Sequence, residues 1–391
     1  MDSTQVTLLI TQLSSLSPRL SNDDDNSRKE ALNISRSLIK ALEKSENLAL
    51  ELAFSPLITV SANIAIDLDL FKLIVKHGPV GSRELESLSG GEELLIVRIL
   101  RPLASIGFVD KVSERVWEPT SVTRAMTTEW IGVGHRTIKV IARGATHKVP
   151  DCFREVGYYC PTDPRDGLVQ YTYQTSLSLF QYLATVPRMS NDFNLFMGST
   201  MGARSYWVNW YSVEERLLKG ATQDTVLLVD VGAGEGHDTL AFHARYPNQG
   251  RLILQDIVPL FDSIQAMDGA IECMTYNFFT AQPVAGARAY FYHHILHDWS
   301  NTMCLEILKQ VRAAMTPGYS KLLLHEMIIP EKGASTSHAV LDLTMMVANA
   351  GMERTESRWW ALLENAGLQI VKVWPASEED ADGIIEAMLP E

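Results

Sequence analysis

The sequence predicts an α/β domain of the Rossmann type in the C-terminal half of the chain, behind a mostly helical N-terminal half. From residue 226 onward, runs of branched aliphatic residues alternate with helical patterns, which is typical of doubly wound domains with a buried parallel sheet. The first of these runs leads directly into a glycine-rich stretch, Gly232-Ala233-Gly234-Glu235-Gly236. A strand, a glycine turn and a helix in this order predict a loop at which a ligand touches the backbone.

The N-terminal part is expected to contain helices and one hairpin. Hydrophobic periodicity predicts the helices, and two alternating segments around a polar turn predict the hairpin. The expected helices cover residues 1–20, 28–53, 61–75 and 92–106, with a short helix behind Ser82 as its N-cap, and the expected strands cover 108–112 and 116–119. Residues 21–27 are polar and acidic, which predicts a mobile linker. Helices followed by a hairpin form the order of a winged-helix unit.

Winged-helix units commonly bind DNA, but the charges argue against that role here. The expected recognition helix carries only Arg98 and Arg101 against Glu92 and Glu93, and the net charge of the chain is -13. An acidic chain without a basic face lacks the electrostatic attraction that nucleic acid binding requires. We therefore predict a dimerisation module with no nucleic acid partner.

The composition favours a soluble, cytoplasmic protein without a structural metal. The 391 residues include four cysteines in no C-x-x-C pair, so their spacing fits no zinc site. The N-terminus has an acidic Asp2 instead of the basic region of a signal peptide. The sequence shows no obvious stretch of about 20 apolar residues, so we expect no membrane partner.

Four segments are expected along the chain. Residues 1–27 form an N-terminal helix and linker, 28–127 the winged-helix-like unit, 128–222 a helical connector and 223–391 the Rossmann-like domain. The connector is rich in aromatic residues, of which most belong to a core and some line an apolar ligand pocket. Phe180 and Phe196 are the candidates for that pocket.

The Rossmann-like domain is predicted from four strands and two helices. The strands are expected at 226–231, 251–255, 289–293 and 321–326, and the helices at 238–245 and 302–315. Asp256 ends the second strand, about 20 residues after the glycines. An acid at this position binds both hydroxyls of a ribose in nucleotide-binding folds. The spacing G-x-G-x-G differs from that of hydride-transfer cofactor sites, so we expect another nucleoside-containing ligand.

Three titratable residues follow the ends of later strands. His297 lies in the segment His293-His294-Ile295-Leu296-His297-Asp298-Trp299, Glu326 ends the fourth strand, and Glu353 precedes the next expected helix. Ligands bind at the carboxyl ends of the strands in open α/β sheets. A histidine there can accept a proton, and a carboxylate bonded to it can fix its tautomer. This set predicts acid–base chemistry.

Together these motifs resemble those of the plant and fungal S-adenosylmethionine-dependent O-methyltransferases of the caffeic-acid type. The resemblance rests on DVGAGEG, LQD, NFF, ILHDW, HEMIIP and GMERT, covers about residues 55–375 and is best for the fungal branch. It implies an S-adenosylmethionine-binding domain and a homodimer formed through the N-terminal unit. It also implies a small-molecule substrate.

The resemblance implies a role for each matching residue. Those that would bind the cofactor are Asp230, Gly232, Gly234, Gly236, Asp256, Asn277, Phe278 and His293. His297 would be the general base, with Glu326 and Glu353 as flanking acids, and Met345, Met346 and Asn349 would clamp the substrate. Ala233 and Asn277 depart from the usual Gly and Asp, and weaker cofactor binding is the expected result.

The implied reaction is methyl transfer, without a metal, to a hydroxyl of a small aromatic or enolic secondary metabolite. An alternative stays open, because some fungal relatives keep the cofactor pocket but catalyse pericyclic reactions such as dehydration with Alder-ene or hetero-Diels–Alder cyclisation. In that case His135 or Arg204 could polarise a substrate carbonyl. A retained base with paired acids favours methyl transfer. A non-enzymatic DNA-binding regulator is disfavoured by the missing basic helix.

Overall fold

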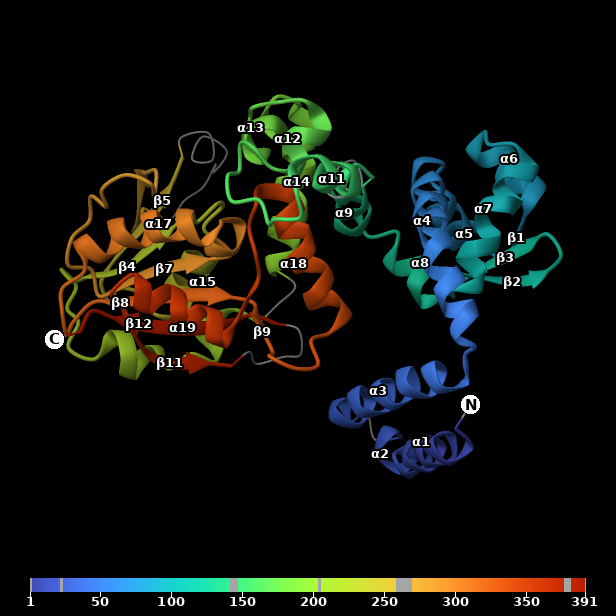
Figure 1. Cartoon of the computed structure of the whole chain (residues 1–391), viewed down its shortest axis with the longest axis horizontal. Helices are drawn as coiled ribbons and strands as arrows, with labels where there is room; N and C mark the ends of the chain where they lie inside the picture. The colour runs from blue at the N-terminus through green and yellow to red at the C-terminus, as the bar shows by residue number, and fades with distance from the viewer. Residues whose placement is uncertain are drawn as a thin grey trace. The chain divides into compact units, whose positions relative to one another are not determined.

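The computed structural model describes residues 2–21, 24–140, 147–202, 205–257, 269–375 and 381–390, without the side chains of 199–202. The chain divides into two compact units, residues 1–127 and 128–391. Figure 1 shows the helices and strands of both units. Each unit has buried hydrophobic residues of its own.

Unit 1 consists of helices around a small antiparallel sheet. The helices are α1 (Ser3–Ser15), α2 (Ser17–Leu20), α3 (Asp25–Leu42), α4 (Ser45–Asp67), α5 (Leu70–His77), α6 (Ser82–Ser89), α7 (Glu93–Ser105) and α8 (Ser121–Ala125). The strands β1 (Val80–Gly81), β2 (Val109–Ser113) and β3 (Val116–Pro119) pair in the order β1-β3-β2. Leu85, Leu100 and Trp117 are fully buried between them. The helices and the hairpin therefore occur in the predicted order.

Four local predictions for unit 1 were wrong. The helix expected at 28–53 is divided between two helices, because α3 ends at Leu42 and α4 begins at Ser45. The linker expected to run to residue 27 ends earlier, because α3 begins at Asp25 and Ser27 is buried with its hydroxyl donating to Asp24. The helix expected at 61–75 is interrupted where Asp69 adopts a φ of 53°. Ser82 is the first residue of α6 and not its N-cap, since its hydroxyl contacts the Glu93 carboxylate at 2.7 Å.

Helix α4 exposes a large apolar surface. Leu50, Leu52 and Phe54 are 60%, 75% and 63% exposed. Within the described residues, α4 alone is long and apolar enough to span a membrane, which corrects the expectation that no such stretch exists. Length and composition are weak evidence for a span, because a core helix of a soluble protein meets the same criteria.

Unit 2 is built on a seven-stranded mixed sheet with the strand order β11-β12-β8-β7-β4-β5-β6. The strands are β4 (Val226–Val231), β5 (Arg251–Asp256), β6 (Ile271–Thr275), β7 (Ala289–His293), β8 (Lys321–Glu326), β11 (Gln369–Trp374) and β12 (Gly383–Met388). Strands β4 to β8 pair in parallel, and β12 runs antiparallel between β8 and β11. The doubly wound fold is confirmed, and the four predicted strands are present.

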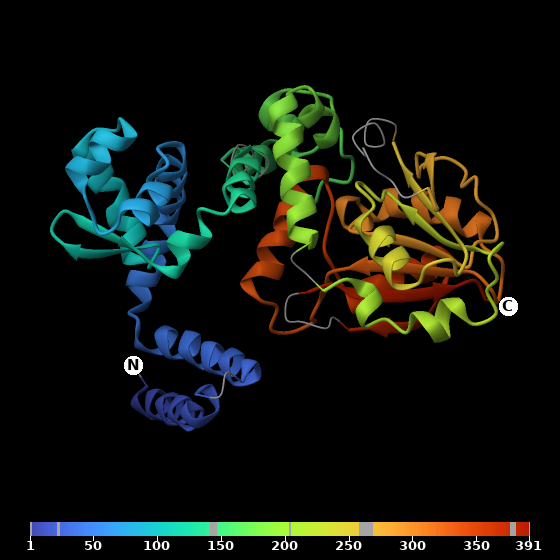
Figure 2. The same cartoon turned by 180° about the vertical axis from the view of Figure 1, so that it is seen from behind.

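Alternate residues of each strand face opposite layers of helices. Tyr290 and Tyr292 pack on α17 (Asn301–Ala314) and α19 (Glu356–Asn365), whereas Phe291 packs toward α15 (His237–Arg245) and the short helix η2 (Trp207–Asn209). A period of two with both faces buried explains why these strands are continuous apolar runs in the sequence. Figure 2 shows the same sheet from behind, with the red C-terminal strands beside orange β8.

A second helical layer adjoins the carboxyl ends of the strands. It contains α9 (Glu129–Ile138), α11 (Val149–Val156), α12 (Leu168–Tyr173), α13 (Leu179–Ala184), α14 (Pro187–Gly202) and α18 (Thr336–Asn349). Leu168, Leu183 and Val347 share one apolar cluster, which ties α12 and α13 to α18. Arg136 on α9 forms a bidentate pair with Asp192 on α14 at 2.9 and 3.0 Å.

A fully buried carboxylate, that of Glu386, joins the C-terminal strand to the rest of the sheet. Its oxygens contact Lys321 Nζ at 2.9 Å and Arg216 Nε at 3.1 Å, and they accept hydrogen bonds from Tyr211 and Trp374. These groups hold the pKa of Glu386 below its usual range, although burial alone would raise it. The carboxylate is therefore ionised inside the sheet.

Removing this carboxylate should destabilise unit 2. We expect Glu386→Ala to lower the free energy of unfolding by about 3–5 kcal/mol, because it leaves two cations without a partner. Urea denaturation at pH 7 measures this change. Glu364→Ala, at an exposed position on α19, is the matched control and should change stability by less than about 0.5 kcal/mol. A loss below about 1 kcal/mol for Glu386→Ala would show that the buried carboxylate does not stabilise unit 2 in this way.

Candidate active site

The glycine loop between β4 and α15 adopts a conformation that only glycine accepts readily. Gly232, Gly234 and Gly236 have φ values of 72°, 54° and 72°, in the left-handed region. A Cβ atom on Gly232 would lie 2.5 Å from Ile295, whereas one on Gly234 would meet no atom within 4 Å. Ala233 does not have a positive φ, so its replacement of a glycine causes no backbone strain. The loop has open space above Gly234.

One aspartate binds this loop, and a second binds the first turn of α15. Asp256 Oδ2 accepts a hydrogen bond from Gly234 N at 2.7 Å, and Asp230 Oδ2 accepts one from the Thr239 hydroxyl at 2.6 Å. Burial and the nearby Asp238 carboxylate raise the pKa of Asp230 to about 7. Burial also raises the pKa of Asp256. The structure thus places both predicted cofactor ligands at the glycine loop.

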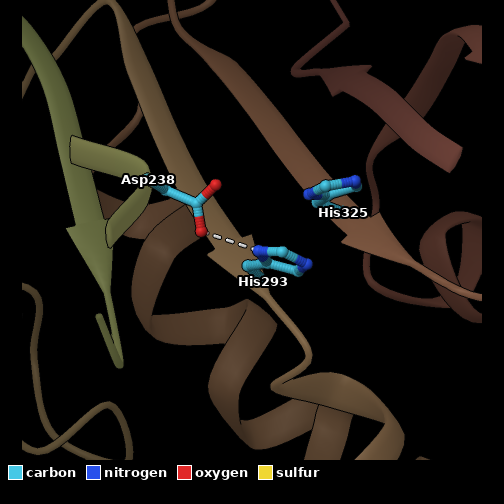
Figure 3. Close-up of side chains that lie close together, drawn as sticks. All are labelled: Asp238, His293 and His325. Atoms are coloured by element: carbon cyan, nitrogen blue, oxygen red, sulfur yellow. Dashed lines mark hydrogen bonds and ion pairs between the residues drawn. The ribbon is translucent and has the colours of Figure 1, made fainter. Parts of the chain in front are cut away.

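His293 ends β7 next to the first turn of α15. Its Nδ1 lies 2.7 Å from Asp238 Oδ2 (Figure 3). Burial disfavours the imidazolium, but the Asp238 and Asp382 carboxylates outweigh this effect and raise the pKa of His293 to about 9. The ring is therefore a cation at neutral pH. The sequence alone did not indicate Asp238 as its partner.

His297 lies in the turn η4 (Leu296–Asp298), directly after β7, and is 8% exposed. Its Nδ1 is 2.7 Å from Glu353 Oε1, and its Nε2 is 3.7 Å from Asp298 Oδ1. Burial opposes protonation, but the Glu353 and Asp298 carboxylates raise the pKa of His297 to about 10. The structure brings together two of the three residues singled out for acid–base chemistry in one imidazole–carboxylate pair.

Glu326 and Asn349 contact the backbone of the same turn. Glu326 Oε1 accepts hydrogen bonds from Leu296 N at 2.8 Å and Ile295 N at 3.2 Å. Its Oε2 is buried without a hydrogen-bond partner, and burial raises the pKa of the carboxyl. Asn349 Nδ2 donates to Asp298 O at 3.0 Å. Both side chains therefore fix the position of the turn that carries His297.

Arg354 is a residue of this site that sequence reasoning missed. Its guanidinium is fully buried and donates to Leu296 O at 2.9 Å, Trp299 O at 2.8 Å and Asn301 Oδ1 at 3.0 Å. A signal existed, because Arg354 directly follows Glu353 in the GMERT motif. An arginine beside a candidate acid is ordinarily exposed, so its burial could not be inferred from the sequence.

The remaining predicted site residues lie on several elements. Asn277 Oδ1 accepts from Phe279 N at 3.1 Å, and the Phe278 ring packs edge-on against Trp299 with centroids 5.9 Å apart. Met345 and Met346 lie on α18, one turn before Asn349. Phe180 on α13 contacts Phe193, and Phe196 on α14 packs against Gly134 next to His135 on α9. Arg204 lies outside the described residues.

Comparison with known proteins identifies the family. A family model described as an O-methyltransferase domain matches residues 162–369. O-methyltransferase penC of Penicillium thymicola is 48% identical over 384 residues, covering 98% of this chain and 96% of the relative. O-methyltransferase asqD of Emericella nidulans is 49% identical over 335 residues, covering 85% and 87%.

Solved structures share the fold over nearly the whole chain. OxaC in complex with sinefungin and meleagrin is 26% identical, with a TM-score of 0.86 and full coverage of both chains. LepI in complex with SAM is 27% identical, with a TM-score of 0.85 and full coverage. A structure described as a pericyclic reaction enzyme is 27% identical, with a TM-score of 0.85 over 98% and 99% of the two chains.

The glycine loop, the mixed sheet and the relatives agree with the resemblance predicted from the sequence motifs. The chain belongs to the O-methyltransferase family, whose cofactor is S-adenosylmethionine.

Proposed function

We propose that this protein transfers the methyl group of S-adenosylmethionine to a hydroxyl of a small aromatic or enolic secondary metabolite, with His297 as the general base. The observation that carries the proposal is the buried pair of His297 and Glu353, with Nδ1 and Oε1 2.7 Å apart. A carboxylate on Nδ1 leaves Nε2 to face a substrate proton. Relatives at 48% and 49% identity are named O-methyltransferases, which supports this reaction class.

The residues around the glycine loop fit the cofactor. Gly232, Gly234 and Gly236 would hold its methionine part, Asp256 the ribose, and Asn277 and Phe278 the adenine. Asn277 Oδ1 already accepts a hydrogen bond from Phe279 N. Because an amide is uncharged, Asn277 is also a weaker acceptor for the adenine amino group than a carboxylate would be. His293, a cation at neutral pH, suits the cofactor carboxylate. When bound, S-adenosylmethionine supplies an electrophilic methyl group on a positively charged sulfur.

His297 must lose its proton before it can act as a base. With its pKa raised to about 10, His297 is protonated in the free enzyme at pH 7. A positive charge bound close by disfavours the imidazolium and lowers this pKa. A base of this strength matches a phenol, whose own pKa is near ~10. Glu353 keeps the imidazole oriented and stabilises the imidazolium that forms.

Cyclisation without methyl transfer is the second candidate function. It is favoured by the likeness to a pericyclic reaction enzyme over almost the whole chain. In that reaction the fixed positive charge of the cofactor site would polarise a substrate carbonyl. The buried base with its carboxylate partner has no evident task there, so methyl transfer accounts for more of the site.

For unit 1 we propose a winged-helix-like dimerisation domain that forms a homodimer. Its support is the exposed apolar surface of α4, where Leu50, Leu52 and Phe54 are more than half exposed. Apolar surface of this extent marks an interface with another protein or a membrane. A second copy of the chain covers it in the proposed dimer.

The first test replaces the proposed base. We expect His297→Ala to lower kcat by about 10²- to 10⁴-fold, because a positioned base contributes that much to a proton transfer. Incorporation of label from methyl-labelled S-adenosylmethionine into acceptor phenols measures the reaction. His147→Ala, at an exposed position of unit 2, is the control. Unchanged labelling in His297→Ala would remove His297 as the base, and product formation with all label left on the cofactor would favour cyclisation.

The second test is the pH dependence of the rate. At cofactor and acceptor concentrations well below saturation, we expect kcat/KM to rise about tenfold per pH unit from pH 7 to about pH 9, as the free enzyme loses the His297 proton. It should level off above pH 9, where His293 begins to lose the charge that suits the cofactor carboxylate. Glu353→Gln removes the carboxylate that raises this pKa, so its profile should level off at a lower pH with a lower maximum. A Glu353→Gln profile identical in shape to that of the native protein would contradict the pairing.

The third test addresses the homodimer. The native protein should sediment at twice the chain mass of 43.6 kDa. Phe54→Glu should shift it toward the monomer, because a charge in an apolar interface is strongly disfavoured. Val156→Glu, at a residue of unit 2 that is 64% exposed, is the control and should leave the mass unchanged. A native monomer at micromolar concentration would refute the dimer without affecting the proposed reaction.

A further inference from the structure

Three potential metal ligands meet at the carboxyl ends of two neighbouring strands. His293 ends β7, and His325 lies directly opposite it in the parallel pairing with β8. Asp238 reaches the same place from the first turn of α15. Figure 3 shows the three side chains converging beside the sheet. Methyl transfer as proposed above uses neither Asp238 nor His325.

Their distances suit a shared ion. One ligand atom from each residue lies within 4.8 Å of those of the other two. Asp238 Oδ2 and His293 Nδ1 are 2.7 Å apart, and the rings of His293 and His325 have centroids 3.9 Å apart. Ligand atoms about 2.1 Å from a metal lie about 3 Å from one another at right angles. Small rotations of the two rings would complete such an arrangement.

The cluster also contains an unused ligand atom. His325 is 5% exposed, and its Nδ1 has no hydrogen-bond partner. The Nε2 of His293 lies 3.8 Å from Asp382 Oδ2, which leaves its Nδ1 as the atom that faces Asp238. A buried imidazole with an unpartnered nitrogen is chemically suited to bind a metal ion.

We propose that Asp238, His293 and His325 form a binding site for a divalent transition-metal ion such as Zn²⁺ or Co²⁺. Two imidazoles and one carboxylate are a ligand set that such ions accept, with further positions left for water. On binding, the ion replaces the proton between His293 Nδ1 and Asp238 Oδ2, which passes to solvent. Because His293 is also proposed to contact the cofactor carboxylate, an ion held here alters the cofactor site without taking part in methyl transfer.

A second group of ligands shares His293 and serves as the competing arrangement. His293, His294 and Asp382 also have ligand atoms within 4.8 Å of one another, and His294 Nε2 lies 3.0 Å from Asp382 Oδ1. The first group is favoured because His293 and His325 are fixed by the hydrogen-bonded register of two central strands, and because His325 has an unpartnered buried nitrogen. The two groups predict different effects of substitution.

Titration of tag-free, cofactor-free protein with CoCl₂ tests the proposal, by calorimetry and by the visible absorption of nitrogen-ligated Co²⁺. We expect one ion per chain for the native protein and for His147→Gln, an exposed control. His325→Gln and Asp238→Asn should each weaken binding at least tenfold. Circular dichroism and retained S-adenosylmethionine binding by His325→Gln establish that this variant is folded.

The outcomes are distinct. Native protein without a saturable site, or native affinity in both His325→Gln and Asp238→Asn, would overturn the proposal. Loss of binding in His294→Gln alone would overturn it in favour of the second group. None of these results depends on methyl transfer, so failure of the metal site and failure of the proposed function can be told apart.

Discussion

The candidate active site depends on one buried guanidinium, that of Arg354. The guanidinium is buried. It donates hydrogen bonds to Leu296 O and Trp299 O, on either side of His297 in the chain, and to the side chain of Asn301. Its Cζ atom lies over the ring of Trp359 on α19, 5.0 Å from the ring centroid. A buried guanidinium is stable only when its N–H groups donate hydrogen bonds. The carbonyl groups of Leu296 and Trp299 accept these bonds, and this fixes the backbone of the turn. The position of the imidazole follows from that requirement.

The same turn is also fixed from its other sides. Glu326 binds two amide groups at its start, Asn349 binds the carbonyl of Asp298, and the Met352 amide binds that of His297. A Cβ atom on Gly351 would lie 2.2 Å from His297 O, so only glycine permits this approach. Glu326 and Asn349, which the sequence motifs indicated as site residues, therefore hold the backbone of this turn in place. Glu353 is the acid that hydrogen-bonds to the imidazole, and together with the Asp298 carboxylate it raises the pKa of His297.

The sequence predicted the parts of the fold whose pattern is local. The central strands β4, β5, β7 and β8 are continuous apolar runs, and they occur within a residue of their expected bounds. Strands β6, β11 and β12 were not predicted. β6 is an edge strand with mostly exposed residues, and β12 is buried but contains Glu386, whose charged partners Lys321 and Arg216 lie 65 and 170 residues away in the chain. The family motifs indicated Glu326 and Glu353 as the acids beside His297, but not which of the two contacts the imidazole. The contacts of Asp238, His325 and Arg354 are tertiary and leave no sequence spacing to detect.

The place of β12 within the sheet has a consequence for biosynthesis. Among the seven strands of this sheet it comes last in chain order, yet it lies between β8 and β11. Until it emerges from the ribosome, β8 has an open edge, β11 has no neighbour, and the cations of Lys321 and Arg216 await the carboxylate of residue 386. Unit 1 precedes it in the chain and can fold during translation, whereas unit 2 completes its sheet only after translation has passed residue 388. A nascent chain that stalls before that point presents an unprotected strand edge to its surroundings, and this makes it a substrate for chaperones or for aggregation.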